Sequence, residues 1–123
     1  MASAITPRRH HISPSVADLD RQAIWCQQVL GFEAIIEQYE VPEPPVRTVV
    51  LEARTGTRVG LIERAGSRRS RDVTDPLDAC RDQGYGHWAL EVDDLDAAFA
   101  AWPPADGVRP GNLIALVQPP AAA

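Results

Sequence analysis

Two histidines stand at equivalent positions of a segment that occurs twice in the chain. His11 opens the sequence HISPSVADLD and His87 opens HWALEVDDLD, and the His, Val, Asp, Leu and Asp of both segments match at one constant offset. Imidazole changes its charge near neutral pH, so a pair of such side chains could act as general acid and general base. The repeat makes His11 and His87 the first candidates for catalysis.

A second similarity closes each half of the chain. Residues 56–62 read GTRVGLI and residues 111–117 read GNLIALV, and this pair is separated by a smaller offset than the opening pair. The second half is therefore shorter than the first between its opening and closing segments. This arrangement predicts two related modules, the second of them reduced.

Each opening segment is expected to form a strand that leads into a helix. Residues 11–16 and 87–92 can alternate between two faces. Asp18 and Asp94 follow them as suitable N-caps, because a carboxylate accepts hydrogen bonds from the free backbone N–H groups of a helix start. The first helix is expected to end at Gly31.

The remainder of the first half predicts three strands, which gives the order βαβββ. They are expected at residues 32–39, 47–53 and 58–63, with a Pro-rich loop and a turn at Thr55-Gly56 between them. In the second half only the segment 97–110 is left for the corresponding elements, and it contains Pro103, Pro104 and Pro110. We therefore expect a shortened helix and an irregular loop there.

Composition excludes several classes of function. A chain of 123 residues is enough for one domain. Its net charge of -5 argues against a protein that binds nucleic acid through overall positive charge. No segment is typical of a signal peptide or a membrane span, and Cys26 and Cys80 do not form a disulfide framework. We expect a cytoplasmic protein with Cys26 as an inert buried thiol.

The repeat resembles the vicinal oxygen chelate superfamily, which includes glyoxalase I, extradiol dioxygenases and bleomycin-resistance proteins. Members have paired βαβββ modules that open with His-[Ile/Val]-x-x-x-Val-x-Asp-Leu and close with Gly-Asn-Leu-Ile-x-Leu-Val, and the resemblance covers about residues 10–118. It implies an α+β fold with a cupped mixed sheet, in one domain that spans 1–123. Module one would cover about 10–65, a linker 66–84, and the shortened module two 85–118.

The resemblance also implies a ligand set for one divalent metal. In metal-dependent members, each module supplies a His from its opening strand, and these positions fall on His11 and His87. The second ligand of each module is usually a Glu in the closing strand, but these positions fall on Gly60 and Ala115, which have no ligating side chain. Iron, manganese, nickel or zinc held by two imidazoles alone would be weakly bound.

Two alternatives to such a weak metal site are open. The two histidines could work without metal as an acid–base pair. A carboxylate from elsewhere could also complete a metal site, and Glu52 on the neighbouring strand is a candidate. Glu91 shares the face of His87, but it lies roughly 13 Å along the strand, too far for the same metal.

Three further residues are expected to contact substrate. Arg58 is two residues from Gly60, so it should share the inward face and could contact an anionic ligand. Ser13 shares the face of His11 by the same alternation, whereas His10 should point to the opposite face. Trp102 is expected to line the cup or a dimer contact.

The sequence supports a small-molecule enzyme of this type, with lyase, isomerase or dioxygenase chemistry on an oxygenated metabolite. The alternatives are a metal-free binding or antibiotic-resistance module, or a truncated or engineered scaffold with little activity. The expected partners are a small-molecule ligand and a second copy of the chain. Dimerisation is expected because a reduced module exposes strand edges and apolar surface.

Overall fold

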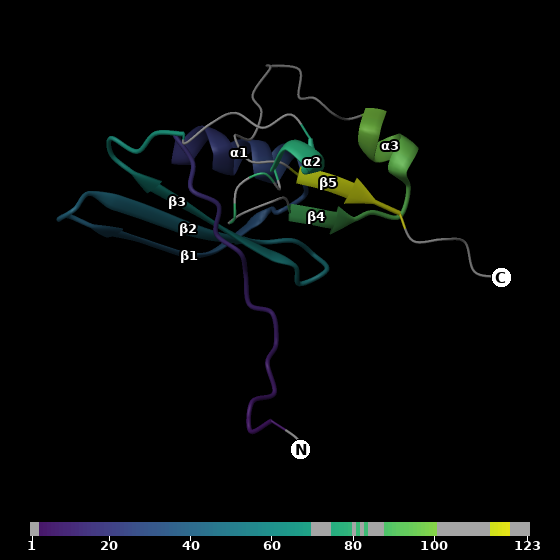
Figure 1. Cartoon of the computed structure of the whole chain (residues 1–123), viewed down its shortest axis with the longest axis horizontal. Helices are drawn as coiled ribbons and strands as arrows, with labels where there is room; N and C mark the ends of the chain where they lie inside the picture. The colour runs from purple at the N-terminus through teal and green to yellow at the C-terminus, as the bar shows by residue number, and fades with distance from the viewer. Residues whose placement is uncertain are drawn as a thin grey trace.

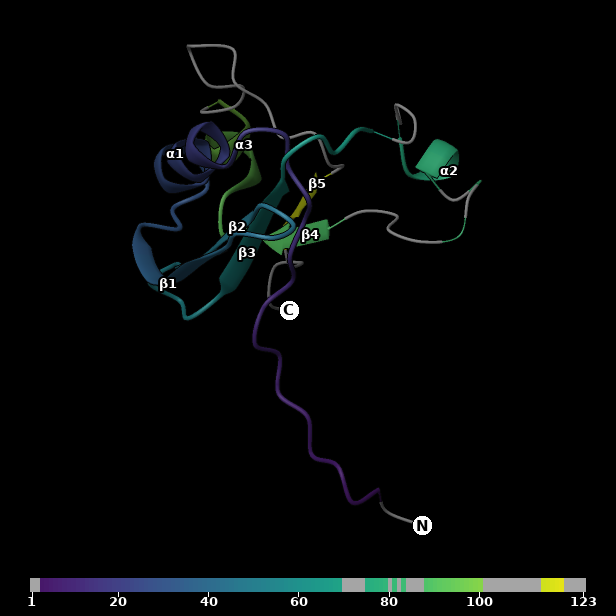
Figure 2. The same ribbon diagram turned by 90° about the vertical axis from the view of Figure 1, so that its left-hand side faces the viewer.

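The chain contains a three-stranded antiparallel sheet with a helix on one face, and a two-stranded parallel sheet (Figures 1 and 2). The structure, a computed structural model, describes residues 3–69, 75–79, 81, 83, 88–100 and 114–118. The elements of the first half are α1 (Leu19–Val29), β1 (Ala34–Val41), β2 (Val46–Glu52) and β3 (Arg58–Arg64). Those of the second are α2 (Pro76–Ala79), β4 (Trp88–Glu91), α3 (Leu95–Ala100) and β5 (Ile114–Val117).

The first half has the helix and the three strands that the sequence predicts. Asp18 caps α1 by accepting a hydrogen bond from the Arg21 N–H at 3.1 Å. Gly31 follows the helix with a positive φ of 78°, a conformation that a residue without Cβ adopts at little cost. The sheet order is β1-β2-β3, and Gly56, also with positive φ, turns the chain between β2 and β3.

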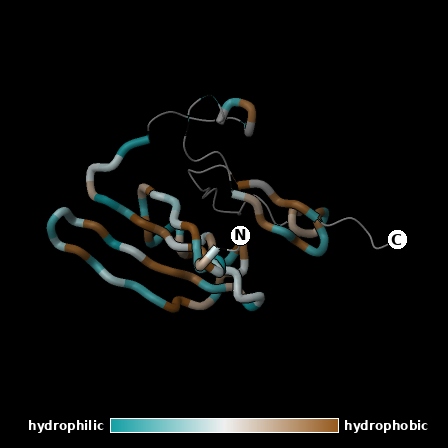
Figure 3. The backbone as a smooth tube through the Cα atoms, turned by 60° about the horizontal axis from the view of Figure 1, so that its bottom comes forward, coloured by the Kyte–Doolittle hydropathy of each residue, from teal (hydrophilic) through white to brown (hydrophobic). Residues whose placement is uncertain are grey.

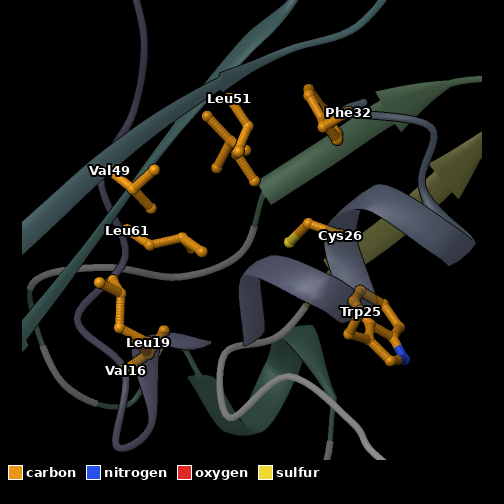
Figure 4. Close-up of a cluster of buried hydrophobic side chains, with 9 residues drawn as sticks. Val16, Leu19, Trp25, Cys26, Phe32, Val49, Leu51 and Leu61 are labelled. Atoms are coloured by element: carbon orange, nitrogen blue, oxygen red, sulfur yellow. The ribbon is translucent and has the colours of Figure 1, made fainter. Parts of the chain in front are cut away.

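The core lies between α1 and one face of this sheet. Figure 4 shows Leu19 and Cys26 of the helix on the side of the apolar residues of β2 and β3, and Figure 3 shows hydrophobic segments along the strands. Burying such side chains stabilises a fold by about 1.5–3 kcal/mol each. The buried cluster consists of Val16, Leu19, Trp25, Cys26, Phe32, Val49, Leu51, Val59 and Leu61.

The opening segment of the first half is less regular than expected. The strand predicted over residues 11–16 is present only as two isolated parallel bridges to β3, which join Ile12 with Val59 and Ser15 with Ile62. Pro14, in the middle of the segment, has no N–H to donate, so a continuous ladder cannot form. The Ile12 and Pro14 carbonyls still accept hydrogen bonds from Gly60 and Ile62, which fix the segment beside β3.

The two halves repeat each other in three dimensions. The offset of the opening segments takes Ile12 to Trp88, and that of the closing segments takes Val59 to Ile114, so the Ile12–Val59 bridge corresponds to the Trp88–Ile114 pair of β4 and β5. The helix starts also correspond, because Asp94 accepts from the Ala97 N–H at 3.0 Å as Asp18 does in the first half. The sequence repeat is therefore a structural repeat of strand pairing and helix capping.

A side chain at the end of each closing strand also holds the first helical residue. Glu63 Oε2 accepts from the Leu19 N–H at 2.7 Å, and Gln118 Oε1 accepts from the Leu95 N–H at 2.7 Å. Both bonds satisfy a backbone donor that the helix itself cannot pair. They connect the strand to the helix that follows the opening segment in the same half.

The second half is shorter and packs on the first. Helix α3 has six residues against eleven in α1, as the short segment available there predicts. Trp88, Leu90 and Ile114 pack against the core, and the Trp88 ring lies 5.8 Å from that of Phe32 between centroids. The irregular loop predicted within 97–110 falls largely outside the described residues. In the part of the chain that the structure describes, no helix has the length and apolar character needed to cross a membrane.

Candidate functional site

The candidate site lies on the sheet face opposite α1, here called the His11 face. Val59 and Leu61 of β3 point into the core, so strand alternation directs Arg58 and Gly60 to the other side. Arg58 pairs with Glu52 of β2, which places Glu52 on the same face. The His11 face therefore combines a carboxylate on β2, a guanidinium on β3 and an imidazole from the segment beside β3.

His11 and Ser13 lie directly over Gly60. A Cβ atom built on Gly60 would collide with Ser13 Oγ and would lie 2.8 Å from His11 Cδ2 and 3.3 Å from His11 Nε2. This contact agrees with the sequence interpretation that Ser13 shares the face of His11. The space in which the resemblance implies a second metal ligand is filled by the imidazole and the hydroxyl, and Gly60 is the residue that allows this close approach.

The His11 ring is paired with the ring of His10. The two Nδ1 atoms are 2.7 Å apart, and the rings meet edge to face with centroids 5.0 Å apart. The expectation that His10 points to the opposite face is therefore wrong. Residue 10 lies two positions before the first bridge to β3, so strand alternation does not govern its side chain. One Nδ1 must donate and the other accept, and this leaves His11 Nε2 directed toward the space over Gly60.

Arg58 is held by a carboxylate from the neighbouring strand. Its Nε–H donates to Glu52 Oε2 at 2.8 Å, and both side chains are about one-third exposed (32% and 30%). The ion pair restricts the Arg58 side chain. It engages Nε, so the two terminal amino groups of the guanidinium, which have no hydrogen-bond acceptor among the described residues, can donate to a ligand. The same contact uses the carboxylate of Glu52, so Glu52 is an ion-pair partner of Arg58 here.

The described residues do not fit a resident divalent metal. Among them, no group of three or more His, Cys, Asp or Glu side chains is placed to hold an ion. The atom beside Gly60 that could ligate a metal is His11 Nε2. The carboxylate of Glu52, which could have been a second ligand, is paired with Arg58. His87, the other histidine that the resemblance implies as a ligand, lies outside the described residues, and the one described imidazole by itself supplies neither the charge nor the coordination geometry that such metals require.

Two predicted site residues, His87 and Trp102, lie outside the described part of the chain. Ala115 lies in β5, where only its backbone is described. The structure therefore brings together His11, Ser13 and Arg58 on one face.

Two features of the site were missed at the sequence level. One is the His10–His11 contact, for which the sequence HH gives no signal. The other is the Glu52–Arg58 pair, which could have been found because the predicted turn at Thr55-Gly56 places residues 52 and 58 opposite each other.

The charged and nucleophilic groups behind the sheet have structural roles. On the α1 face, Arg47 donates to both carboxylate oxygens of Asp20, at 2.8 and 3.2 Å, and this holds the pKa of Asp20 below its ordinary value. Burial raises the pKa of the Cys26 thiol to about 12, so the thiolate needed for nucleophilic attack is not formed near neutral pH. Neither group belongs to the His11 face.

Comparisons with known proteins agree with the fold. Residues 10–112 match the family described as the Glyoxalase/Bleomycin resistance protein/Dioxygenase superfamily. No curated protein matches the sequence. A glyoxylase/bleomycin resistance protein/dioxygenase domain from Frankia sp. EAN1pec is 17% identical, with a TM-score of 0.59 over 94% of this chain and 91% of that one.

Two further solved structures share the fold. A glyoxalase family protein from Bacillus cereus is 17% identical, with a TM-score of 0.55 over 81% of this chain and 72% of its own. A mutant of the fosfomycin resistance protein FosX from Listeria monocytogenes is 16% identical, with a TM-score of 0.54 over 78% of this chain and 69% of its own. That protein was crystallised with Mn(II) and 1S,2S-dihydroxypropylphosphonic acid. At these identities the likeness describes the fold alone.

Proposed function

Because the chain belongs to the glyoxalase/bleomycin resistance protein/dioxygenase superfamily, we propose that it is a small-molecule enzyme that works on its His11 face without a resident metal. Members of this superfamily are often metal-dependent enzymes or resistance proteins that bind small molecules. The observation that carries the proposal is the position of His11 Nε2, over Gly60 and with Nδ1 fixed by His10.

In the proposed reaction, His11 Nε2 transfers a proton to or from an oxygenated substrate, and His87 is its acid–base counterpart. The pairing of His11 Nδ1 restricts the ring, which lowers the entropic cost of placing Nε2 against a substrate atom. The hydroxyl of Ser13, beside the imidazole, donates to a substrate oxygen. Proton transfer of this kind suits lyase or isomerase chemistry, in which charge develops on an oxygen.

The substrate class that the charges favour is a small oxygenated anion. Arg58 presents its terminal amino groups on the same face, and the carboxylate of Glu52 holds the guanidinium in place. A guanidinium matches the geometry of a carboxylate or phosphonate group. Trp102 is proposed as a further residue that contacts the bound molecule.

A binding module without turnover is the second candidate. It requires only groups that the structure describes on the His11 face, because Arg58 and Ser13 can bind an anion without the proton transfer for which the enzyme also needs His87. Both candidates predict that a small molecule binds on the His11 face. They differ in whether the bound molecule is chemically changed.

The proposal is tested by titrating the full chain, in the presence of EDTA, with 1S,2S-dihydroxypropylphosphonic acid and with a panel of small 2-oxo and 2-hydroxy acids. Binding is followed by amide chemical shifts and turnover by proton NMR of the ligand. We expect at least one acid to shift Gly60 and Ser13, and His11→Asn to abolish turnover. Arg58→Gln should weaken binding, whereas Arg54→Gln, an exposed arginine on the loop after β2, should not. Turnover that survives His11→Asn would contradict the proposal.

A further inference from the structure

A line of residues runs along the His11 face from one end of β3 to the other. Arg58, Gly60, Ile62 and Arg64 alternate with the residues of β3 that face α1, so all four lie on the His11 face. Arg58 begins the strand and Arg64 ends it. The extended strand between them separates their Cα atoms by roughly 20 Å at the usual rise per residue. The His11 face therefore has a guanidinium at each end.

The surface between the two arginines is largely apolar. Cross-strand pairing places Val50 of β2 beside Gly60, and Thr48 beside Ile62, on the same side of the sheet. Val50 is only 6% exposed, although it lies on the side away from α1 and outside the core cluster. Thr48 and Ile62 are half-buried. A hydrocarbon chain that lay over these residues would be stabilised by its removal from water.

The guanidinium of Arg64 is available to a ligand. Arg64 is exposed, and its cross-strand neighbour Val46 offers no charge. Among the described residues, no carboxylate forms an ion pair with Arg64, whereas Glu52 is bound to Nε of Arg58. Both ends of the face can therefore donate hydrogen bonds from a guanidinium to an anionic group.

A further charge lies to one side of this line. Glu37 of β1 is paired with Val50, so its side chain is directed to the His11 face. No described residue forms an ion pair with Glu37. Its negative charge disfavours an anionic group over the middle of the face, while Arg58 and Arg64 attract anionic groups to the two ends. The charges and the apolar surface thus favour a ligand that is anionic at both ends and apolar between them.

We propose that the ligand of the His11 face is a linear dianion, of the dicarboxylic acid class, that extends from Arg58 to Arg64. The inference rests on the proposed function, which places one acid group at Arg58 and the oxygenated carbon next to it beside His11. A linear dicarboxylate of eight carbons measures roughly 9 Å between its carboxyl carbons at ordinary bond lengths. The two arginine side chains reach inward from their Cα atoms and span the rest of the distance. The methylene groups then lie over Val50 and Ile62.

The test is calorimetric titration of the full chain with linear dicarboxylic acids from succinic to sebacic acid. Each is compared with the linear monocarboxylic acid of the same number of carbons. We expect the ratio of the two affinities to pass through a maximum within the series, because only one range of lengths reaches both guanidinium groups. At this maximum the dicarboxylic acid should bind about tenfold or more tightly than its monocarboxylic counterpart.

Three variants assign this preference to its residues. Arg64→Gln should lower the affinity for the best dicarboxylic acid about tenfold and leave that for the monocarboxylic acid unchanged, which also shows that the variant is folded. Arg58→Gln should weaken the binding of both acids. Arg21→Gln removes the same charge from the exposed surface of α1, on the other side of the sheet, and should change neither affinity.

The outcomes separate this inference from the proposed function. Equal affinities for the two acids of every pair would overturn the inference and leave the proposed function intact. A preference for the dicarboxylic acid that persists in Arg64→Gln would have the same meaning. If none of the acids binds, both the inference and the proposed function are wrong.

Discussion

The close contact over Gly60 predicts the effect of adding a single methyl group. In Gly60→Ala, the new Cβ meets the Ser13 hydroxyl and the His11 ring, whose Cδ2 would be 2.8 Å away. Overpacking of this kind costs about 1–3 kcal/mol, and the loss of glycine flexibility in the unfolded chain offsets about 0.4–1 kcal/mol. Because His11 and Ser13 are exposed and can move, we expect a net loss of about 1 kcal/mol, or a fall in Tm of roughly 4 °C.

The variant should affect ligand binding more than stability. The imidazole can only relieve the collision by leaving its position over β3, so binding of a small acid should weaken by about tenfold, equivalent to about 1.4 kcal/mol. The measurement is urea unfolding combined with NMR titration. The matched control is Ser13→Ala/Gly60→Ala, in which the hydroxyl that meets the new methyl group is absent. We expect the double variant to regain part of the lost stability, a coupling of about 0.5 kcal/mol or more.

Either of two results would refute this reasoning. The first is that Gly60→Ala unfolds at the same urea concentration as the parent. The second is that the loss of unfolding free energy in the double variant equals the sum of the losses in Ser13→Ala and in Gly60→Ala. In both cases, the hydroxyl and the imidazole would not occupy the space over Gly60 in solution.

Three other predictions follow from contacts elsewhere in the fold. Cys26 should resist iodoacetamide at pH 8 until the chain unfolds, because its thiol is buried and protonated. Since burial raises the pKa of this thiol to about 12, the free energy of unfolding should fall as the pH rises above the ordinary thiol pKa of 9.0. Glu63→Ala should lower the free energy of unfolding by about 1–2 kcal/mol in urea melts, because the Leu19 N–H loses its acceptor. Glu52→Gln should reduce ligand affinity less than Arg58→Gln does in calorimetric titrations, since Glu52 only positions the guanidinium; equal losses would mean that Glu52 itself contacts the ligand.

The first half of the fold could be predicted because its signals are local. Asp18 and Gly31 mark the two ends of α1, and the turn at Gly56 fixes the pairing of β2 with β3. The exact match of the repeat offsets to the strand pairs also indicates that the sequence repeat carries the long-range arrangement. The regularity of the opening segment was overestimated, since Pro14 interrupts a ladder that its repeat partner in β4 completes.

The site was less predictable because its geometry depends on side-chain contacts across strands. Alternation predicted that Ser13 shares the face of His11, but it cannot tell that both side chains fill the space over Gly60. It also failed for His10, whose backbone lies outside any strand. The pairing of Glu52 with Arg58 could have been predicted from the turn at Thr55-Gly56, and the role of Glu52 depends on this register, because a slip of one residue would move its side chain to the other face.

Calorimetric titration of the EDTA-treated full chain with Mn²⁺ tests most directly whether the His11 face functions without a resident metal. We expect no stoichiometric binding at submillimolar Mn²⁺, and the same titration curve for His11→Ala as for the parent. One Mn²⁺ bound per chain in the parent and lost in His11→Ala would contradict this expectation.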